Sequence, residues 1–190
     1  MSNQVEISNI ALIRIGARIL SSPDENVKSA RVISQVWDFV RNVVLEAHPW
    51  KFANTIKELA ETTEPANKWD YAFTLPTECM VPLIINADED AEFERVGDEL
   101  HTNESTCVLT FTQLITNTGL FSAHFVDTMS YRLAAEIALP LIGVGSKGQA
   151  VRKDMMNEYR AALVDAFDMD DAQNNEKMVT RPLPWISARS

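Results

Sequence analysis

The sequence predicts an α+β fold that is mainly α: a helical bundle with a long strut helix, a small antiparallel β insertion and an extended C-terminal arm. Three observations predict it. Apolar residues recur at steps of three and four before residue 48 and again after residue 122, as on one face of a helix. Between them, residues 50–121 contain short β-branched and aromatic runs bounded by turn residues. From residue 168 the chain is polar and acidic.

The first predicted helix covers residues 3–15. It has too many apolar positions for a narrow stripe, so we expect the helix to be buried on most sides. Gly16 follows, and glycine commonly ends a helix because it adopts the left-handed conformation without steric cost. No basic segment followed by an apolar run stands at the start of the chain, so no signal peptide is expected.

The second predicted helix, residues 23–47, has the clearest start signal. Ser22 can cap it, Pro23 suits its first turn, and Glu25 can close a capping box. The apolar pattern ends before Pro49, because the residue that precedes proline avoids helical geometry. Such a helix spans about 37 Å, given the rise per helical residue. We therefore expect it to act as a strut.

The β region, residues 50–121, is expected to hold four to six short strands in one small antiparallel sheet inserted between the helices. Residues 81–85 and 107–112 are its clearest strand segments, because they are β-branched or aromatic and end at turn residues. Residues 88–90 and 103–105 are polar and are predicted to be hairpin loops. The two cysteines, Cys79 and Cys107, are expected to be small buried hydrophobes in a reducing compartment, with a disulfide as the alternative.

Two further helices are predicted over residues 123–142 and 149–167. Pro140 weakens the last turn of the first, and the glycines that follow break it. The stretch Gly143–Gly148 superficially resembles a phosphate-binding loop, but it follows a helix, and a glycine follows Lys147 where that motif needs Ser or Thr. We therefore expect a helix-to-helix turn there. Together these elements make residues 1–167 one domain.

The sequence contains no recognisable catalytic constellation, so we expect no enzyme activity, no cofactor and no metal. The three histidines, His48, His101 and His124, are scattered and are expected at the surface or at helix ends. No nucleophile-elbow motif occurs. The carboxylates lie in loop-like stretches, where solvated charge is expected rather than acid–base chemistry: Asp88, Glu89, Asp90, Asp168, Asp170 and Asp171.

Charge restricts the partners of the chain. With 17 basic and 27 acidic residues the formal charge is −10, and such a surface repels phosphates, so a grip on nucleic acid is not expected. An acidic channel can nevertheless let DNA slide without sticking. The longest apolar stretch, residues 133–144, contains Glu136 and is too short to span a bilayer. The helices also carry arginines that can contact other subunits or face solvent: Arg31, Arg41, Arg132, Arg152 and Arg160.

Residues 168–190 are expected to be a flexible linker and a docking arm. The linker ends in an extended apolar peptide of the kind that orders on a partner, with Trp185 as the anchor. A tail without a partner is the alternative. The residues predicted to bind are Arg181, Pro182, Leu183, Pro184, Trp185, Ile186 and Arg189.

Three stretches resemble the tail tubular protein A family, the head-to-tail adaptors of T7-like short-tailed phages. They occur in family order over some 140 residues: 9–16 with 19–24 and 48–53, then 69–79, then 121–125 leading into 133–138. The resemblance implies a mostly helical subunit with a small β region and no cofactor. It also implies that twelve copies form a ring between the portal protein and the tail nozzle, a tail tubular protein B-like protein, and extend the DNA channel.

The resemblance places the protein in the virion, at the tail or neck, after assembly in the host cytoplasm, with no membrane partner. The docking arm is then expected to engage the portal or a neighbouring subunit. Three alternatives stay open at this point. The first is a neck or completion protein of a long-tailed phage, the second is a small hydrolase that uses unrecognised carboxylates, and the third is an acidic cytoplasmic binding module unrelated to phage.

Overall fold

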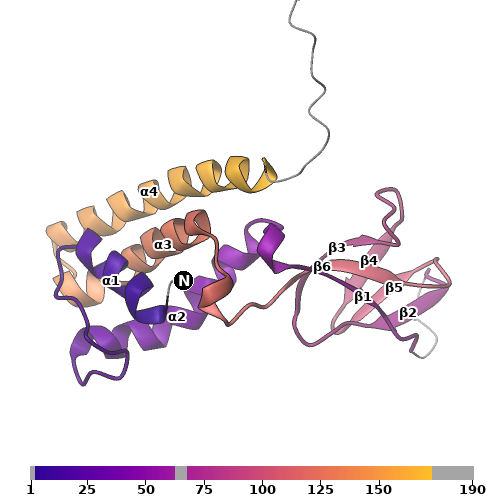
Figure 1. Cartoon of the computed structure of the whole chain (residues 1–190), viewed down its shortest axis with the longest axis horizontal. Helices are drawn as coiled ribbons and strands as arrows, with labels where there is room; N and C mark the ends of the chain where they lie inside the picture. The colour runs from indigo at the N-terminus through magenta and orange to yellow at the C-terminus, as the bar shows by residue number, and fades with distance from the viewer. Residues whose placement is uncertain (1–2, 63–67, 173–190) are drawn as a thin grey trace, which may run out of the picture.

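The computed structural model describes residues 3–62 and 68–172. Figure 1 shows the helices gathered at one end of the molecule and the strands at the other. The predicted α+β class, with an antiparallel β insertion between helices, is confirmed. The described elements are α1 Gln4–Arg14, α2 Lys28–Glu46, η1 Lys51–Ala53, β1 Asn54–Glu58, β2 Tyr71–Thr74, β3 Cys79–Ile85, β4 Phe93–Val96, β5 Glu99–Thr102, β6 Val108–Gln113, η2 Thr118–Leu120, α3 Ala123–Ile142 and α4 Ser146–Asp171.

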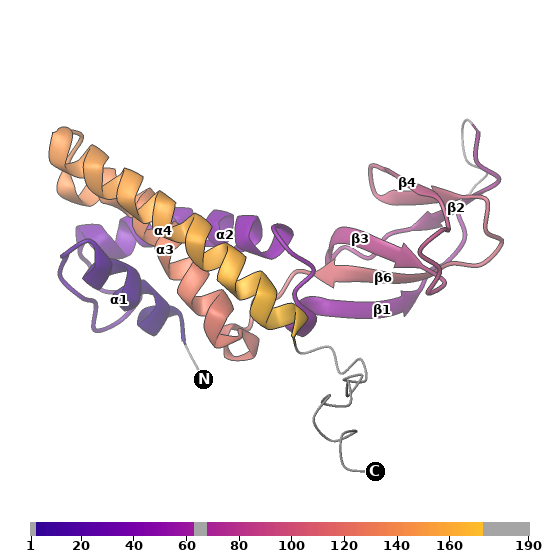
Figure 2. The same ribbon diagram turned by 90° about the horizontal axis from the view of Figure 1, so that it is seen from above.

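Helix α3 is the centre of the helical part. It packs against α1, α2 and α4, and Figure 2 shows α4 crossing over it with α1 and α2 on either side. Residues of α3 that are fully buried, such as Leu133 and Ile137, form the middle of this core because apolar burial drives the packing. None of the described helices is both long enough and apolar enough to cross a membrane.

Helix α2 begins at Lys28, so the predicted start at residue 23 is wrong. The Glu25 carboxylate does not close a capping box. It accepts a hydrogen bond from the Ser21 N–H (3.0 Å) and pairs with the Arg18 guanidinium (2.9 Å), which keeps this stretch in the preceding loop. The helix has 19 residues and is about 28 Å long. The 26-residue α4 is longer, about 39 Å, and lies on the outside of the bundle.

Helix α4 starts at Ser146 and continues to Asp171, beyond the predicted range 149–167. The expectation that residues 168–171 form a flexible linker is therefore wrong. Asp170 is 4% exposed, and its carboxylate accepts a hydrogen bond from the Lys51 N–H (3.0 Å), which explains why the helix continues. The rest of the predicted linker and arm, from residue 173 on, lies outside the described residues.

The turn between α3 and α4 is the predicted helix-to-helix connection. A side chain at Gly148 would place its Cβ 1.8 Å from the Gly143 carbonyl oxygen, so only glycine fits where α4 passes this carbonyl. Gly143 itself has a φ of 116° and ends α3. Gly148 therefore serves close packing between the two helices, and Gly143 supplies the positive φ at the end of α3.

The β part contains two three-stranded antiparallel sheets, β1-β6-β3 and β2-β5-β4, where the sequence predicts one. The hairpin loops predicted at residues 88–90 and 103–105 are wrong, because each connects strands of different sheets. The tight hairpin joins β4 to β5 at Gly97 and Asp98, and Gly97 has the positive φ (64°) that such turns need. A small core lies between the sheets and includes Leu100 and Phe111.

Asn86 and Ala87, just after β3, both adopt left-handed conformations, with φ of 54° and 56°. Asn86 is held there by three hydrogen bonds to the chain beside it: its N–H donates to the Val108 carbonyl (2.8 Å), its side-chain amide donates to the Thr106 carbonyl (2.8 Å), and its side-chain oxygen accepts from the Val108 N–H (2.9 Å). Ala87 is a non-glycine residue in a conformation that strains its Cβ.

The chain passes between the helical and the β part twice, before β1 and after β6. We call the region around these two crossings the joint, and an aromatic cluster fills it. The cluster consists of Trp50, Phe52, Phe121, Phe125 and Phe167. Trp50 is fully buried, its indole N–H donates to the Val44 carbonyl (2.7 Å), and its ring meets that of Phe125 edge-on at 5.1 Å. The joint is thus packed and hydrogen-bonded.

Candidate interaction surfaces

The predicted docking residues cannot be placed. Arg181, Pro182, Leu183, Pro184, Trp185, Ile186 and Arg189 all lie outside the residues that the structure describes. The last described residues, at the end of α4, lie against the joint, because Asp170 contacts Lys51 and His48. The candidate surfaces of the described part of the chain therefore lie on its helices and sheets.

Both cysteines are free and buried, as the sequence predicts. Burial raises the pKa of the Cys107 thiol to about 11. Burial also raises the pKa of Cys79, against a smaller opposing effect of the Arg95 charge. Both groups are thus protonated thiols at neutral pH, whereas a cysteine nucleophile acts as the thiolate.

The prediction of surface or helix-end positions is wrong for His101, which is buried, whereas His48 lies just after the end of α2 as predicted, with a side chain that is largely covered. The His48 ring stacks on Phe167 at 4.4 Å, and its Nε2 lies 3.2 Å from an Asp170 carboxylate oxygen. His101 is 3% exposed, and its Nε2 lies 3.1 Å from a Glu99 oxygen. The His48–Asp170 pair ties the end of α4 to the segment after α2.

The described carboxylates are mostly exposed. Asp88, Glu89 and Asp90 are solvated, as predicted, whereas Asp170 is buried and already bound to the joint. Within residues 3–62 and 68–172, no group of three or more His, Cys, Asp and Glu side chains is arranged to hold a metal ion. The surfaces with a distinct character are instead hollows on either flank of α4.

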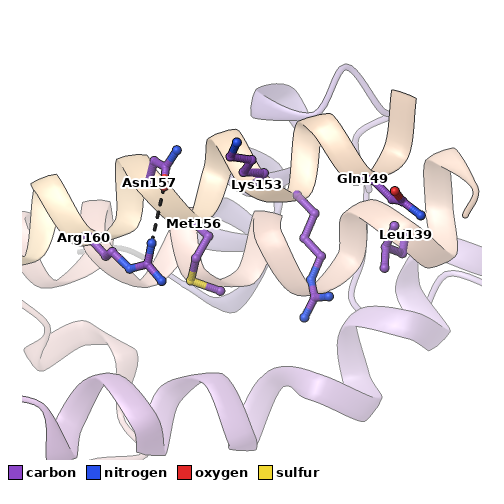
Figure 3. A pocket seen from close by; sticks show the side chains of 7 residues that line it. Leu139, Gln149, Lys153, Met156, Asn157 and Arg160 are labelled. Carbon is purple, nitrogen blue, oxygen red and sulfur yellow. Dashed lines mark hydrogen bonds between the residues drawn. The ribbon is translucent and has the colours of Figure 1, made fainter. Parts of the chain in front are cut away.

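A basic hollow of about 480 Å³ follows one flank of α4 (Figure 3). Figure 3 shows Met156 and Arg160 extending from the same side of the helix, and Leu139 of α3 lying beside Gln149. Residues 152, 156 and 160 are four apart, so their side chains stack along one face. The lining has three cations and no carboxylate, in a chain of net charge −10: Leu139, Gln149, Arg152, Lys153, Met156, Asn157 and Arg160.

Arg132 of α3 adds a further cation behind this flank. Its guanidinium lies over the Tyr159 ring (5.6 Å) and near the Phe39 ring of α2 (5.8 Å), and it donates to the Met156 sulfur. Glu136 neutralises it at 2.8 Å. The basic hollow therefore lies on the α2 side of α4.

An acidic hollow of about 240 Å³ lies on the other flank of α4, toward α1. Glu158 follows Met156 by two residues, which places it about 200° further round the helix. Asp127 pairs with Arg14 of α1 at 2.5 Å. The lining is His124, Asp127 and Tyr131 of α3 with Glu158, Ala161, Ala162 and Asp165 of α4. Helix α4 thus separates a basic surface from an acidic one.

A third hollow, of about 470 Å³, lies on the outer face of the sheet β1-β6-β3. It is mainly apolar, and Ile56 at its rim is 70% exposed. The strained Ala87 also lines it. This face has a different character from the charged flanks of α4.

Sequence reasoning named Arg152 and Arg160 as possible subunit contacts but did not join them into one surface. Their spacing could have indicated a common surface, because Arg152, Met156 and Arg160 are four residues apart on a predicted helix and none of them is acidic. That Leu139 of α3 lines the same surface could be learned only from the structure. In comparisons with known proteins, no family model matches the chain and no curated protein matches it.

Proposed function

We propose that the chain is a structural virion protein: a head-to-tail adaptor that forms a ring between portal and tail nozzle and extends the DNA channel. One observation carries the proposal. The outer helix α4 offers surfaces of opposite charge on its two flanks, so one copy can present a different surface to each of two neighbours. A closed ring of identical subunits requires such two-sided copies. The resemblance to the tail tubular protein A family supports the same role.

The two-part architecture suits an adaptor between two different partners. The helical part and the β part lie at opposite ends of the molecule, so each can face a different neighbour along the tail axis. In this proposal one end contacts the portal protein and the other the nozzle, and twelve copies surround the DNA. The net charge of −10 supports passage of DNA without specific binding.

The docking arm has a role of its own in this proposal. Residues 181–189 engage the portal or the adjacent adaptor, with the Trp185 indole as the anchor. A chain that ends after Glu176 should then bind the portal much more weakly than the full chain does. If truncation leaves portal binding intact, the arm has no such role, although the ring proposal would survive.

The ring proposal is tested by measuring mass in solution. The free chain and a mixture with the portal protein encoded by the same genome are compared by light scattering. We expect a stoichiometric complex in which many 21.3 kDa subunits join one portal. A ring that forms without the portal also supports the adaptor. A chain that neither self-associates nor binds the portal contradicts the proposal.

A further inference from the structure

We infer that the basic hollow on α4 receives the acidic flank of α4 from a second copy of this chain, so that copies join head to tail through this helix. The acidic flank is the part of α4 that lines the acidic hollow: Glu158, Ala161, Ala162 and Asp165. The inference rests on the proposed function for closure into a ring, although the contact itself does not require a portal or a phage. Its partner is a second copy because both complementary surfaces are present on the same chain.

The cations of the basic hollow are free to accept a partner. Within the part of the chain that the structure describes, Arg152, Lys153 and Arg160 form no ion pair, and the Arg160 guanidinium donates a hydrogen bond only to the Asn157 side-chain oxygen, at 3.4 Å. Other arginines of the helical part, such as Arg14 and Arg132, each hold a carboxylate. The basic hollow is thus a place where positive charge has been left uncompensated.

The acidic flank likewise carries uncompensated charge, of the opposite sign. Glu158 and Asp165 are exposed and form no ion pair among the described residues, whereas Asp127 beside them is already bound to Arg14. Glu158 and Asp165 are seven residues apart, about 10 Å along the helix. Arg152 and Arg160 are eight residues apart, about 12 Å. Two ion pairs between copies can therefore form together.

The uncharged side chains that lie between the charged residues also complement each other in shape. Met156 lies between Arg152 and Arg160 on the basic side, and its flexible side chain adapts to the surface it meets. On the acidic side, the residues between Glu158 and Asp165 include Ala161 and Ala162, whose small side chains allow a close approach. The methionine of one copy can thus occupy the alanine-lined surface of the next.

Charge also determines the symmetry of the contact. Two basic flanks repel each other, and so do two acidic flanks, so a two-fold dimer through the same flank is disfavoured. The remaining arrangement is heterologous, and it leaves one free flank at each end for a further copy. Because exposed ion pairs are weak and screened by salt, the free chain should be monomeric when dilute and associate at low salt or on a template.

Cross-linking between variants that each carry one added cysteine tests the contact. Arg160→Cys and Asp165→Cys, both at exposed positions, are mixed at high concentration and low salt with a short bismaleimide. Cys79 and Cys107 are buried and should not react. We expect a covalent dimer from the mixture, little from either variant alone, and a ladder of multimers from the double variant. Glu104→Cys, exposed in the β part, replaces Asp165→Cys in the control mixture.

Charge reversal gives an independent test of the same contact. Arg152→Glu with Arg160→Glu makes both flanks acidic, and Glu158→Lys with Asp165→Lys makes both basic. Each double variant alone should lose self-association in sedimentation at low salt, and the mixture should regain it. Circular dichroism checks that both are folded. Homodimers of Arg160→Cys, or a mixture that cross-links no better than the Glu104→Cys control, would overturn the inference.

The same variants separate this inference from the proposed function. A ring on the portal that is built from copies with cysteines at positions 160 and 165, and that does not cross-link between these positions, overturns the α4 contact and leaves the adaptor role intact. Head-to-tail cross-links in a chain that ignores the portal support the α4 contact and contradict the adaptor role.

Discussion

The helical part and the β part hold their shapes in different ways. In the helical part, α1, α2 and α4 pack around α3, and a large core reaches from α1 to the aromatic cluster of the joint. The β part closes a smaller core between two short sheets. It also contains both of the described non-glycine residues with positive φ, Asn86 and Ala87. The strain thus lies in the region with less buried apolar surface to offset it, so the β part should open first.

A matched pair of core substitutions gives the largest effect and tests this directly. Leu133 of α3 and Leu100 of β5 are both fully buried. Leu133→Ala and Leu100→Ala should each cost about 2–5 kcal/mol, because each leaves a cavity. Hydrogen exchange read by region should show Leu100→Ala opening the β part alone, whereas Leu133→Ala opens both parts. Equal acceleration of exchange in α3 by the two variants would show that the two parts unfold as one unit.

Asp170→Ala has the next largest effect, because it breaks the tie between α4 and the joint. The half-buried Lys51 N–H loses its acceptor and His48 loses its partner, which should cost about 1–3 kcal/mol of unfolding free energy in urea. Asp171→Ala is the control, since that side chain is 64% exposed and lies 3.7 Å from His48. Equal effects of the two substitutions would show that the buried carboxylate has no special role.

Two glycine substitutions in the strained turn should change stability in opposite directions. Ala87→Gly removes the steric cost of a positive φ and should stabilise the β part by about 0.5–1 kcal/mol. Asn86→Gly removes the same cost but also the side-chain hydrogen bonds to Thr106 and Val108, so we expect a net loss. Urea midpoints of the two variants measure this. Stabilisation by both would mean that those hydrogen bonds contribute little.

A last effect appears only at alkaline pH. Burial raises the pKa of Cys107 in the β part from its usual value near 9 to about 11 in the folded state. The folded state therefore favours the protonated thiol, and this contribution is full below pH 9 and is lost as the pH rises toward 11. Cys107→Ala should show a smaller decline in unfolding free energy over this range than the wild type.

A second residue provides the matching test in the helical part. Burial also raises the pKa of Tyr159, against the opposing charge of Arg132, so Tyr159→Phe should likewise reduce the alkaline decline. If neither substitution changes the slope between about pH 9 and 11, the burial of these two groups does not control alkaline stability.

The sequence predicted most of the fold because periodicity is a local property. The range 123–142 agrees with α3, since its apolar face and the glycines after it are all within the segment. The start of α2 could not be read in the same way. Ser22 and Glu25 match a capping box in spacing, but Arg18 and the Ser21 N–H bind the Glu25 carboxylate from the preceding loop.

The end of α4 and the pairing of the strands depended on residues far apart in the chain. Asp170 looked like solvated charge because the Lys51 N–H that binds it is distant in sequence. The loops at residues 88–90 and 103–105 looked like hairpins because nothing local shows that the strands flanking each belong to different sheets. The basic surface on α4 could be seen in part from the spacing of Arg152 and Arg160, and the predicted docking arm lies outside the described residues.

The joint also determines how force passes through the molecule. Asn54 at the start of β1 pairs with Thr112 near the end of β6, so the two chain crossings lie side by side at the base of the β part. A pull on the β part is therefore carried by two adjacent peptide segments that are loaded together. The Asp170–Lys51 hydrogen bond connects one of them directly to the end of α4. A tilt of the β part would thus be transmitted along the same helix whose flanks carry the two charged surfaces.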